Sequence, residues 1–254
     1  MPEQGVVERL RAAGCVFAEE EAELLRAAAA GPAELDVLVE RRAAGLPLEH
    51  VVGWADFGGL RIQVDPGVFV PRRRTEFLVE RAVAAARPGA VCVDLCCGSG
   101  AAAAVLLARV AGAEVHAADI EPASVRCARR NVEPRGGRVY EGDLFAPLTE
   151  ELRGRVEVLV ANVPYVPSDE VGLLPAEARD HEPLVALDGG ADGLDVLRRV
   201  AAEAPGWLAP GGVLLSEASE RQCEAAIAIL TSAGLTARVL VDEDRYATVV
   251  AATR

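Results

Sequence analysis

The chain has 254 residues, 51% of them hydrophobic, which is enough to bury one sizeable core with a small appendage. Its formal net charge is −13 at pH 7, and every basic residue is an arginine because the sequence contains no lysine. Such a chain repels a nucleic-acid backbone unless its basic residues cluster, so nucleic acid is disfavoured as a substrate. No run approaches the roughly 20 uncharged apolar residues that span a bilayer, and the first residues lack an apolar signal core. We therefore expect a cytoplasmic protein without a membrane segment.

The cysteines are not spaced like metal ligands or a disulfide framework. No two of them have the C-x-x-C spacing of zinc sites, and the sequence holds only 3 histidines. We interpret them as small apolar residues in a reducing compartment, and we predict no metal site. The positions are Cys15, Cys92, Cys96, Cys97, Cys127 and Cys223.

Two small units precede the main domain. Apolar residues recur at three- and four-residue spacing from residue 6 to about residue 42, which predicts two or three short helices, broken at Gly31-Pro32 among other places. We assign residues 1–45 to an N-terminal helical domain. Residues 46–74 alternate apolar and polar positions on both sides of Gly58-Gly59, which is typical of a β-hairpin, and we assign them to a two-stranded connector.

Helix and strand patterns alternate over residues 75–254, which we assign to an α/β domain. Near-continuous apolar strands between helices indicate a doubly wound, mostly parallel sheet, and the last two strands should add an antiparallel edge. The expected helices are Glu76–Ala86, Ala101–Val110, Pro122–Asn131, Leu194–Leu208 and Gln222–Ser232. The expected strands are Ala90–Leu95, Glu114–Asp119, Arg138–Glu141, Val156–Ala161, Val213–Glu217, Thr236–Leu240 and Tyr246–Ala251.

A glycine turn from Asp94 to Gly100 follows the first of these strands and is a candidate ligand loop. In such sheets the ligand lies at the carboxyl ends of the strands, where backbone amides and helix N-termini face it. Gly98 and Gly100 lack the Cβ atoms that would keep a ligand away from the backbone. Asp119, 19 residues after Gly100 at the end of the next strand, is suitably placed to accept hydrogen bonds from ribose hydroxyls. Gly98, Gly100 and Ala103 also satisfy the G-x-G-x-x-A spacing of nicotinamide enzymes, so the loop alone leaves the ligand open.

The segment Asn162-Val163-Pro164-Tyr165 closes a later strand and favours methyl transfer to a planar nitrogen. The lone pair of an amide or exocyclic amine is delocalised, so acceptors that bind its N–H groups can orient the nitrogen toward a methyl donor. The Asn162 side-chain oxygen and the Val163 carbonyl can be these acceptors. Pro164 restricts Val163 to extended backbone conformations, and Tyr165 can pack on the flat group. We therefore predict an S-adenosylmethionine-dependent methyltransferase with these four residues as its catalytic segment.

Over nearly its whole length the sequence resembles the HemK/PrmC-type protein-(glutamine N5) methyltransferases. The likeness is most specific in the Pro-Arg-x-x-Thr-Glu segment and in the stretch from His-Glu-Pro to Asp-Gly-Gly. The segments that carry it are Pro47 to His50 with Gly53, Val64 to Arg72 with Thr75-Glu76, Asp94 to Gly100, Gly142 to Phe145, Asn162 to Tyr165, Glu177 to Pro183, Ala186 to Gly190 with Asp192 to Leu194, and Pro210 to Gly212.

The resemblance implies a class I, Rossmann-like methyltransferase fold with S-adenosyl-L-methionine as the cofactor. Known members methylate the glutamine of the Gly-Gly-Gln loop of peptide chain release factors, or a glutamine of a ribosomal protein, so it also implies a protein partner. Asn162 to Tyr165 would hold the substrate glutamine, Asp119 the donor's ribose and Asp143-Leu144 its adenine. The full set implied to contact the donor is Asp94, Cys96, Cys97, Gly98, Ser99, Gly100, Asp119, Asp143, Leu144 and Asn162.

Three departures from the family pattern stand out. Val163 occupies a position where the family usually has proline, so the turn loses one fixed φ while its carbonyl remains. Cys96-Cys97 replace the common Gly-Thr. Arg73-Arg74 replace a proline and an acid, and we interpret the resulting patch Arg72–Arg74 as a solvated hinge.

Two other functions fit part of the pattern. An Asn-Pro-Pro-Tyr tetrad also fits adenine-N6 methyltransferases of RNA or DNA, which the net charge disfavours. The altered residues also fit a paralogue that binds the donor with impaired catalysis. His181-Glu182-Pro183 is interpreted as a structured loop near the site and not as a base, because the amide nitrogen can lose its proton after methyl transfer. The oligomeric state is left open.

Overall fold

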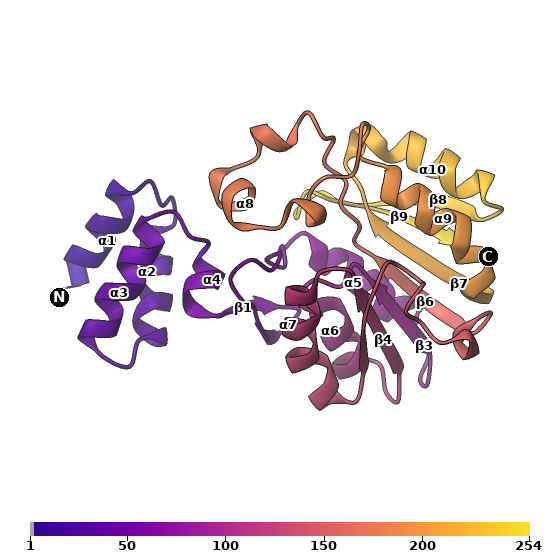
Figure 1. The fold of residues 1–254 in the computed structure, drawn as a ribbon, viewed down its shortest axis with the longest axis horizontal. Helices are drawn as coiled ribbons and strands as arrows, with labels where there is room; N and C mark the ends of the chain where they lie inside the picture. Colours follow the sequence, from indigo (N-terminus) through magenta and orange to yellow (C-terminus); the bar gives the residue numbers. More distant parts are fainter. Residues whose placement is uncertain (1–2) are drawn as a thin grey trace.

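The computed structural model describes residues 3–254, and its N-terminal part is a bundle of helices. These helices are α1 (Glu3–Ala12), α2 (Ala18–Ala28), α3 (Pro32–Ala43) and the short α4 (Leu48–Val52). Their apolar faces meet in a cluster of their own that includes Leu10, Leu25 and Val39. Figure 1 shows this bundle at one end of the molecule, away from the sheet.

A two-stranded hairpin connects the bundle to the sheet domain. Its strands β1 (Trp54–Phe57) and β2 (Leu60–Gln63) are antiparallel, with Trp54 opposite Gln63. Phe57 and Ile62 are buried against residues of α5 and α6, so the hairpin is packed on the main domain through its apolar face. The turn packs closely on the main domain, since a Cβ on Gly58 would lie 2.6 Å from a methyl of Val105.

The main sheet has seven strands in the order β5-β4-β3-β6-β7-β9-β8. The first five are parallel, whereas β9 is antiparallel to both of its neighbours. Strands β3 and β6 lie inside the sheet and are buried almost throughout, which explains their unbroken apolar sequences. The strands are β3 (Val91–Leu95), β4 (Glu114–Asp119), β5 (Arg138–Glu141), β6 (Val156–Ala161), β7 (Leu208–Glu217), β8 (Thr236–Asp242) and β9 (Ala247–Thr253).

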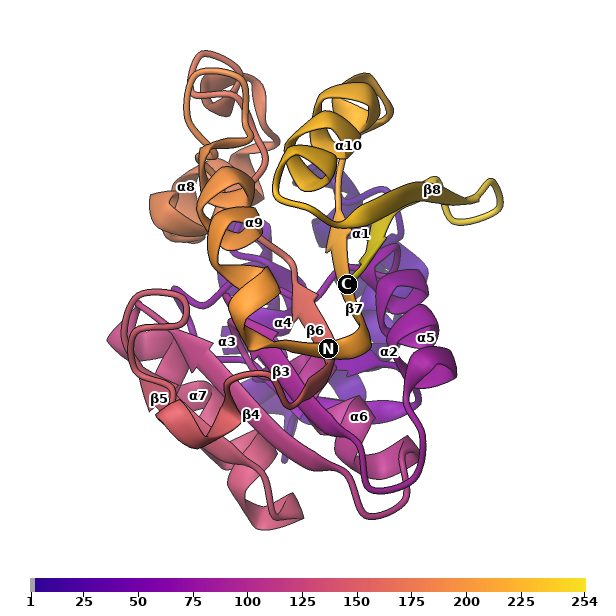
Figure 2. The same cartoon turned by 90° about the vertical axis from the view of Figure 1, so that its right-hand side faces the viewer.

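Helices cover both faces of this sheet (Figure 2). On one face α5 (Thr75–Ala85), α6 (Ala101–Arg109) and α7 (Pro122–Val132) share a hydrophobic cluster with the strands. On the other face α9 (Asp195–Trp207) and α10 (Cys223–Ser232) form a second cluster. The short α8 (Ala176–His181) belongs to a long connection after β6 that lies between the bundle and the sheet domain in Figure 1.

The structure and the sequence-based expectations agree on the mostly parallel sheet with its antiparallel edge. Two local expectations were wrong. Val51-Val52 belongs to α4 and not to the hairpin, and β7 begins at Leu208 instead of Val213. A strand through Pro210 and two glycines has no apolar alternation, which is why its first half was missed. The division at residues 45/46 and 74/75 stays a prediction.

Within residues 3–254, none of the helices has the length and apolar character needed to cross a membrane.

Candidate active site

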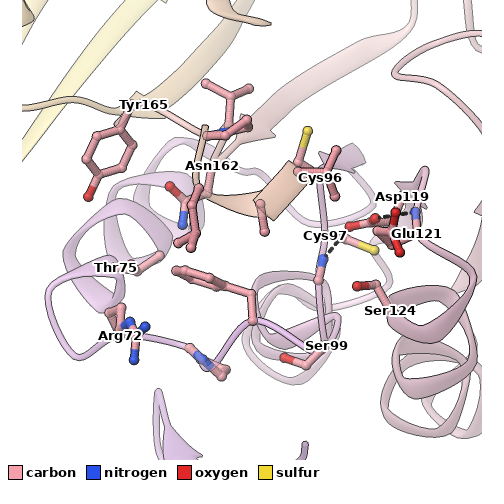
Figure 3. Close-up of a pocket in the computed structure, with 18 of the residues that line it drawn as sticks. Arg72, Thr75, Cys96, Cys97, Ser99, Asp119, Glu121, Ser124, Asn162 and Tyr165 are labelled. Atoms are coloured by element: carbon pink, nitrogen blue, oxygen red, sulfur yellow. Dashed lines mark hydrogen bonds between the residues drawn. The ribbon is translucent and has the colours of Figure 1, made fainter. Parts of the chain in front are cut away.

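A cavity of about 410 Å³ lies at the carboxyl ends of the parallel strands (Figure 3). The glycine loop after β3, the end of β4 and the segment after β6 all line this cavity. All but one of the predicted site residues line it; the exception is Gly100. Those that do are Asp94, Cys96, Cys97, Gly98, Ser99, Asp119, Asp143, Leu144 and Asn162 to Tyr165.

The two glycines of the loop face different neighbours. Both are in the left-handed region, with φ of +54° at Gly98 and +76° at Gly100. A Cβ on Gly98 would meet only the Cβ of Phe69, at 3.9 Å across the cavity, whereas a Cβ on Gly100 would lie 2.7 Å from a methyl of Val132 in α7. Gly98 therefore leaves room for a ligand, and Gly100 allows close packing of the loop on α7.

Carboxylates dominate the end of the cavity near the glycine loop. Asp119 accepts a hydrogen bond from the Gly98 N–H at 2.8 Å, which ties the end of β4 to the loop, and Figure 3 draws this contact. Asp94 is 2% exposed and accepts a hydrogen bond from the Ala103 N–H at 3.0 Å. Burial raises the pKa of Asp94 to about 7, and burial also raises the pKa of Asp119. The half-exposed Asp143 pairs with Arg199 at 2.5 Å.

Asn162 lies at the opposite end of the cavity from Asp119, beside Tyr165 (Figure 3). Its side-chain amide forms no hydrogen bond with any residue that the structure describes, although it lines the cavity. Val163 is 3% exposed and packs into the core cluster beneath the segment. The backbone between Asn162 and Pro164 is thus fixed by packing, while the Asn162 amide remains available to a ligand.

The basic patch is largely paired, so its interpretation as a solvated hinge was wrong for Arg72 and Arg74. Arg72 binds Glu182, whose side chain is fully buried, with an N–O distance of 2.5 Å. Arg74 binds Glu217 at 2.8 Å and donates to the Tyr165 hydroxyl at 2.8 Å. Both arginines line the cavity and connect its rim to buried carboxylates.

The long connection after β6 supplies an apolar wall of the cavity. Leu174, Val185 and Leu187 line it from this connection. Glu177 of α8 also lines it and pairs with Arg42 of α3 at 2.7 Å, which links the wall to the N-terminal bundle. This connection also carries the exposed apolar side chains Leu173, Leu184 and Val185.

Several residues that build the site were missed by sequence reasoning. Asn131 of α7 donates to the Ser99 carbonyl and to the Gln63 carbonyl, each at 2.9 Å, so it joins the glycine loop to the hairpin. Glu182 lies in the segment interpreted as a structured loop near the site, but its role as acceptor of hydrogen bonds from Arg72 and from the Val70 N–H was not indicated by the sequence. His181 does not line the cavity. Nothing in the local pattern pointed to Asn131, because its partners are 32 and 68 residues away.

Comparisons with known proteins are consistent with this geometry. Residues 59–174 match the family model described as the methyltransferase small domain. A release factor glutamine methyltransferase from Geobacter sulfurreducens is 39% identical over 199 residues, which are 78% of this chain and 69% of the relative. The chain belongs to the family of the release factor glutamine methyltransferases. It is therefore an S-adenosylmethionine-dependent methyltransferase, which decides against the nicotinamide alternative.

Two further similarities mark the breadth of this group. A 4-amino-L-phenylalanine/4-methylamino-L-phenylalanine methyltransferase from Streptomyces pristinaespiralis is 38% identical over 205 residues, 77% of this chain and 69% of the relative. A solved methyltransferase from Pyrococcus furiosus has a TM-score of 0.58 at 17% identity, covering 77% of this chain and 89% of its own, which shows a common fold. The chain matches about two thirds of the length of its first curated relatives.

The family's cofactor fits the residues at the glycine-loop end of the cavity. Gly98 leaves open the space that a Cβ would occupy, and Asp94 and Asp119 line the same cavity. S-adenosylmethionine carries ribose hydroxyls and an ammonium group, and the side-chain oxygens of Asp119 in this cavity can accept hydrogen bonds from such donors.

Proposed function

We propose that this methyltransferase modifies the side-chain amide nitrogen of a glutamine in a protein. The observation that carries the proposal is the Asn162 amide, which lines the cavity without a hydrogen-bond partner among the described residues. The side-chain amide of Asn162 is therefore free to form hydrogen bonds with a polar group of the substrate. An amide nitrogen with its N–H groups is the complementary partner for the Asn162 oxygen.

The proposed roles divide the cavity into a donor end and an acceptor end. We assign Asp94, Cys96, Cys97, Gly98, Ser99, Asp119, Asp143 and Leu144 to the donor. Bound S-adenosylmethionine supplies an electrophilic methyl group. Gly100 supports the loop by packing on α7 and has no direct contact with the donor in this proposal.

At the acceptor end the chain acts mainly by positioning. The Asn162 oxygen and the Val163 carbonyl accept the two amide N–H groups and so hold the nitrogen's lone pair toward the donor end. No described residue donates a backbone hydrogen bond to the Val163 carbonyl, so it too is available. The packing of Val163 in the core replaces the rigidity that a proline would give, which argues against the impaired-paralogue alternative.

The acceptor protein that we propose is a peptide chain release factor. The curated relatives with 39% and 45% identity are named release factor glutamine methyltransferases. The exposed Leu173 and Leu184 beside the apolar wall of the cavity suit contact with another protein. A ribosomal protein is the less supported acceptor. A cytoplasmic location accords with this acceptor and with free thiols at all six cysteines.

A second acceptor class is an aromatic amine. It is favoured by the Streptomyces pristinaespiralis relative, whose name describes methylation of 4-amino-L-phenylalanine. The rings of Phe69 and Tyr165 line the cavity and offer flat contacts to an aromatic ring. An aryl amine presents the same delocalised nitrogen as an amide.

Labelled methyl transfer distinguishes the two classes. The full chain is incubated with labelled S-adenosylmethionine and either a purified bacterial release factor or 4-amino-L-phenylalanine. We expect one methyl group on a glutamine side chain of the release factor, located by peptide mass spectrometry. Labelling of the small amine alone would overturn the proposed acceptor in favour of the second class, and labelling of neither would overturn both.

A further inference from the structure

A buried carboxylate, Glu217, lies behind the acceptor end of the cavity. It is the last residue of β7, the strand next to β6, and it is 4% exposed. One of its oxygens accepts hydrogen bonds from the Tyr165 hydroxyl at 2.6 Å and from the Arg74 Nε at 2.8 Å. The other accepts from the Thr75 hydroxyl at 2.8 Å. Two segments distant in sequence, Arg74-Thr75 and Tyr165, therefore converge on a single side chain that does not itself line the cavity.

These contacts fix the position of the Tyr165 ring. The phenol donates to Glu217 and accepts from Arg74, so both hydrogen-bonding functions of its oxygen are used. The Arg74 guanidinium lies 6.0 Å from the centre of the same ring. Arg74, Thr75 and Tyr165 all line the cavity. The aromatic wall beside Asn162 is consequently held from behind by charged hydrogen bonds, which are stronger than neutral ones.

We propose that Glu217 is a positioning residue for methyl transfer, acting through Tyr165. Its carboxylate clamps the phenol so that the ring confines the acceptor's flat group against Asn162. This inference rests on the proposed assignment of Asn162 and Tyr165 to the acceptor. A misplacement of about 1 Å at a reacting group can cost about 100-fold in rate, so a residue without contact to substrate can affect turnover strongly.

A merely structural role for Glu217 makes a different prediction. Loss of a buried charge partner would then lower the stability of the whole domain and weaken donor binding with it. The positioning role instead predicts a fall in kcat with the donor's Kd preserved, because the donor end of the cavity is built by other segments. The two roles also differ in whether the effect requires the Tyr165 hydroxyl.

The test is a double-mutant cycle of Glu217→Gln and Tyr165→Phe in the full chain. A purified bacterial release factor serves as acceptor, and donor binding is measured by calorimetry. The matched control is Glu80→Gln, which removes a carboxylate that pairs with Arg245 at 2.7 Å and does not line the cavity. All variants are compared at the same folded fraction, monitored by thermal unfolding.

We expect Glu217→Gln to lower kcat about 10- to 100-fold with the donor's Kd within about twofold of wild type, and Glu80→Gln to leave both unchanged. In the Tyr165→Phe background, Glu217→Gln should have little further effect, because the clamped hydroxyl is already absent. Equal effects of Glu217→Gln in both backgrounds, or an unchanged kcat in the single variant, would overturn the inference.

A measurement without acceptor separates this inference from the proposed function. The chain has only 3 tyrosines, so the ¹³Cζ resonance of Tyr165 is assigned by its loss in Tyr165→Phe. We expect Glu217→Gln to shift this resonance and Glu80→Gln to leave it in place. An unshifted resonance in Glu217→Gln would refute the clamp. If the wild-type chain does not methylate the release factor, the proposed function fails, and this resonance alone decides the inference about Glu217.

Discussion

The two glycines of the donor loop should respond very differently to the same added methyl group. In Gly100→Ala the new Cβ would lie 2.7 Å from Val132 and 3.1 Å from the Cβ of Ala128, at a φ of +76°. Overpacking costs about 1–3 kcal/mol and a left-handed non-glycine residue about 1–2 kcal/mol, so we expect a loss of roughly 2–5 kcal/mol in the free energy of unfolding. In Gly98→Ala the nearest atom is 3.9 Å away, so only the left-handed cost of about 1–2 kcal/mol applies.

Donor binding should show the opposite order once both variants are folded. The methyl group of Gly98→Ala enters the cavity and should weaken binding of S-adenosylmethionine, whereas that of Gly100→Ala faces α7. Urea unfolding gives the free energies and calorimetry the donor's Kd. Equal destabilisation by the two substitutions, or intact donor affinity in Gly98→Ala, would refute the division of roles between these glycines.

Three further substitutions test the supports of the site. Arg42→Met leaves the carboxylate of Glu21 without its partner in a site where the two side chains are only 8% and 11% exposed. We expect the free energy of unfolding in urea to fall by about 3–5 kcal/mol, and a fall below about 1 kcal/mol would contradict this. Asn131→Ala leaves the Gln63 N–H and the Ser99 carbonyl without their partner, so we expect the free energy of unfolding to fall by about 2–4 kcal/mol. We also expect calorimetry to show a raised Kd for the donor, and an unchanged Kd would contradict a role of Asn131 in holding the glycine loop. The pKa of Asp94 is about 7 in the folded chain, well above that of an unfolded aspartate, so the folded state binds this proton more tightly. The free energy of unfolding of the wild type, relative to that of Asp94→Asn, should therefore fall as the pH rises from about 4 to 7. A difference that does not change with pH in urea unfolding would refute the raised pKa.

The regular parts of the fold could be predicted because each carries a strong local signal. Strands such as Val156–Ala161 are continuous apolar runs, and α7 begins with a proline at its first turn. Short or irregular elements lack such a signal. The five residues of α4 are fewer than two helical turns, and β7 passes through Pro210-Gly211-Gly212, which reads as a turn.

The candidate site could be predicted where its residues follow strands directly, and not where it depends on tertiary contacts. Asp119 and Asn162 come at or after strand ends, so the topology of a parallel sheet was enough to bring them to one edge. Arg74 could not be assigned from sequence, because its partner Glu217 is 143 residues away. Gly100 was expected to contact the donor, but the space that its missing Cβ leaves belongs to α7.

The most direct test of the central claim is methyl transfer by Asn162→Ala, measured together with donor binding. Removal of one hydrogen-bonding group that acts on the reacting centre costs about 100- to 1,000-fold in kcat. We expect a loss of that size with a release factor as acceptor, while the Kd for S-adenosylmethionine stays within about twofold of wild type, as the donor end of the cavity is untouched. Full transfer activity in Asn162→Ala would contradict the account.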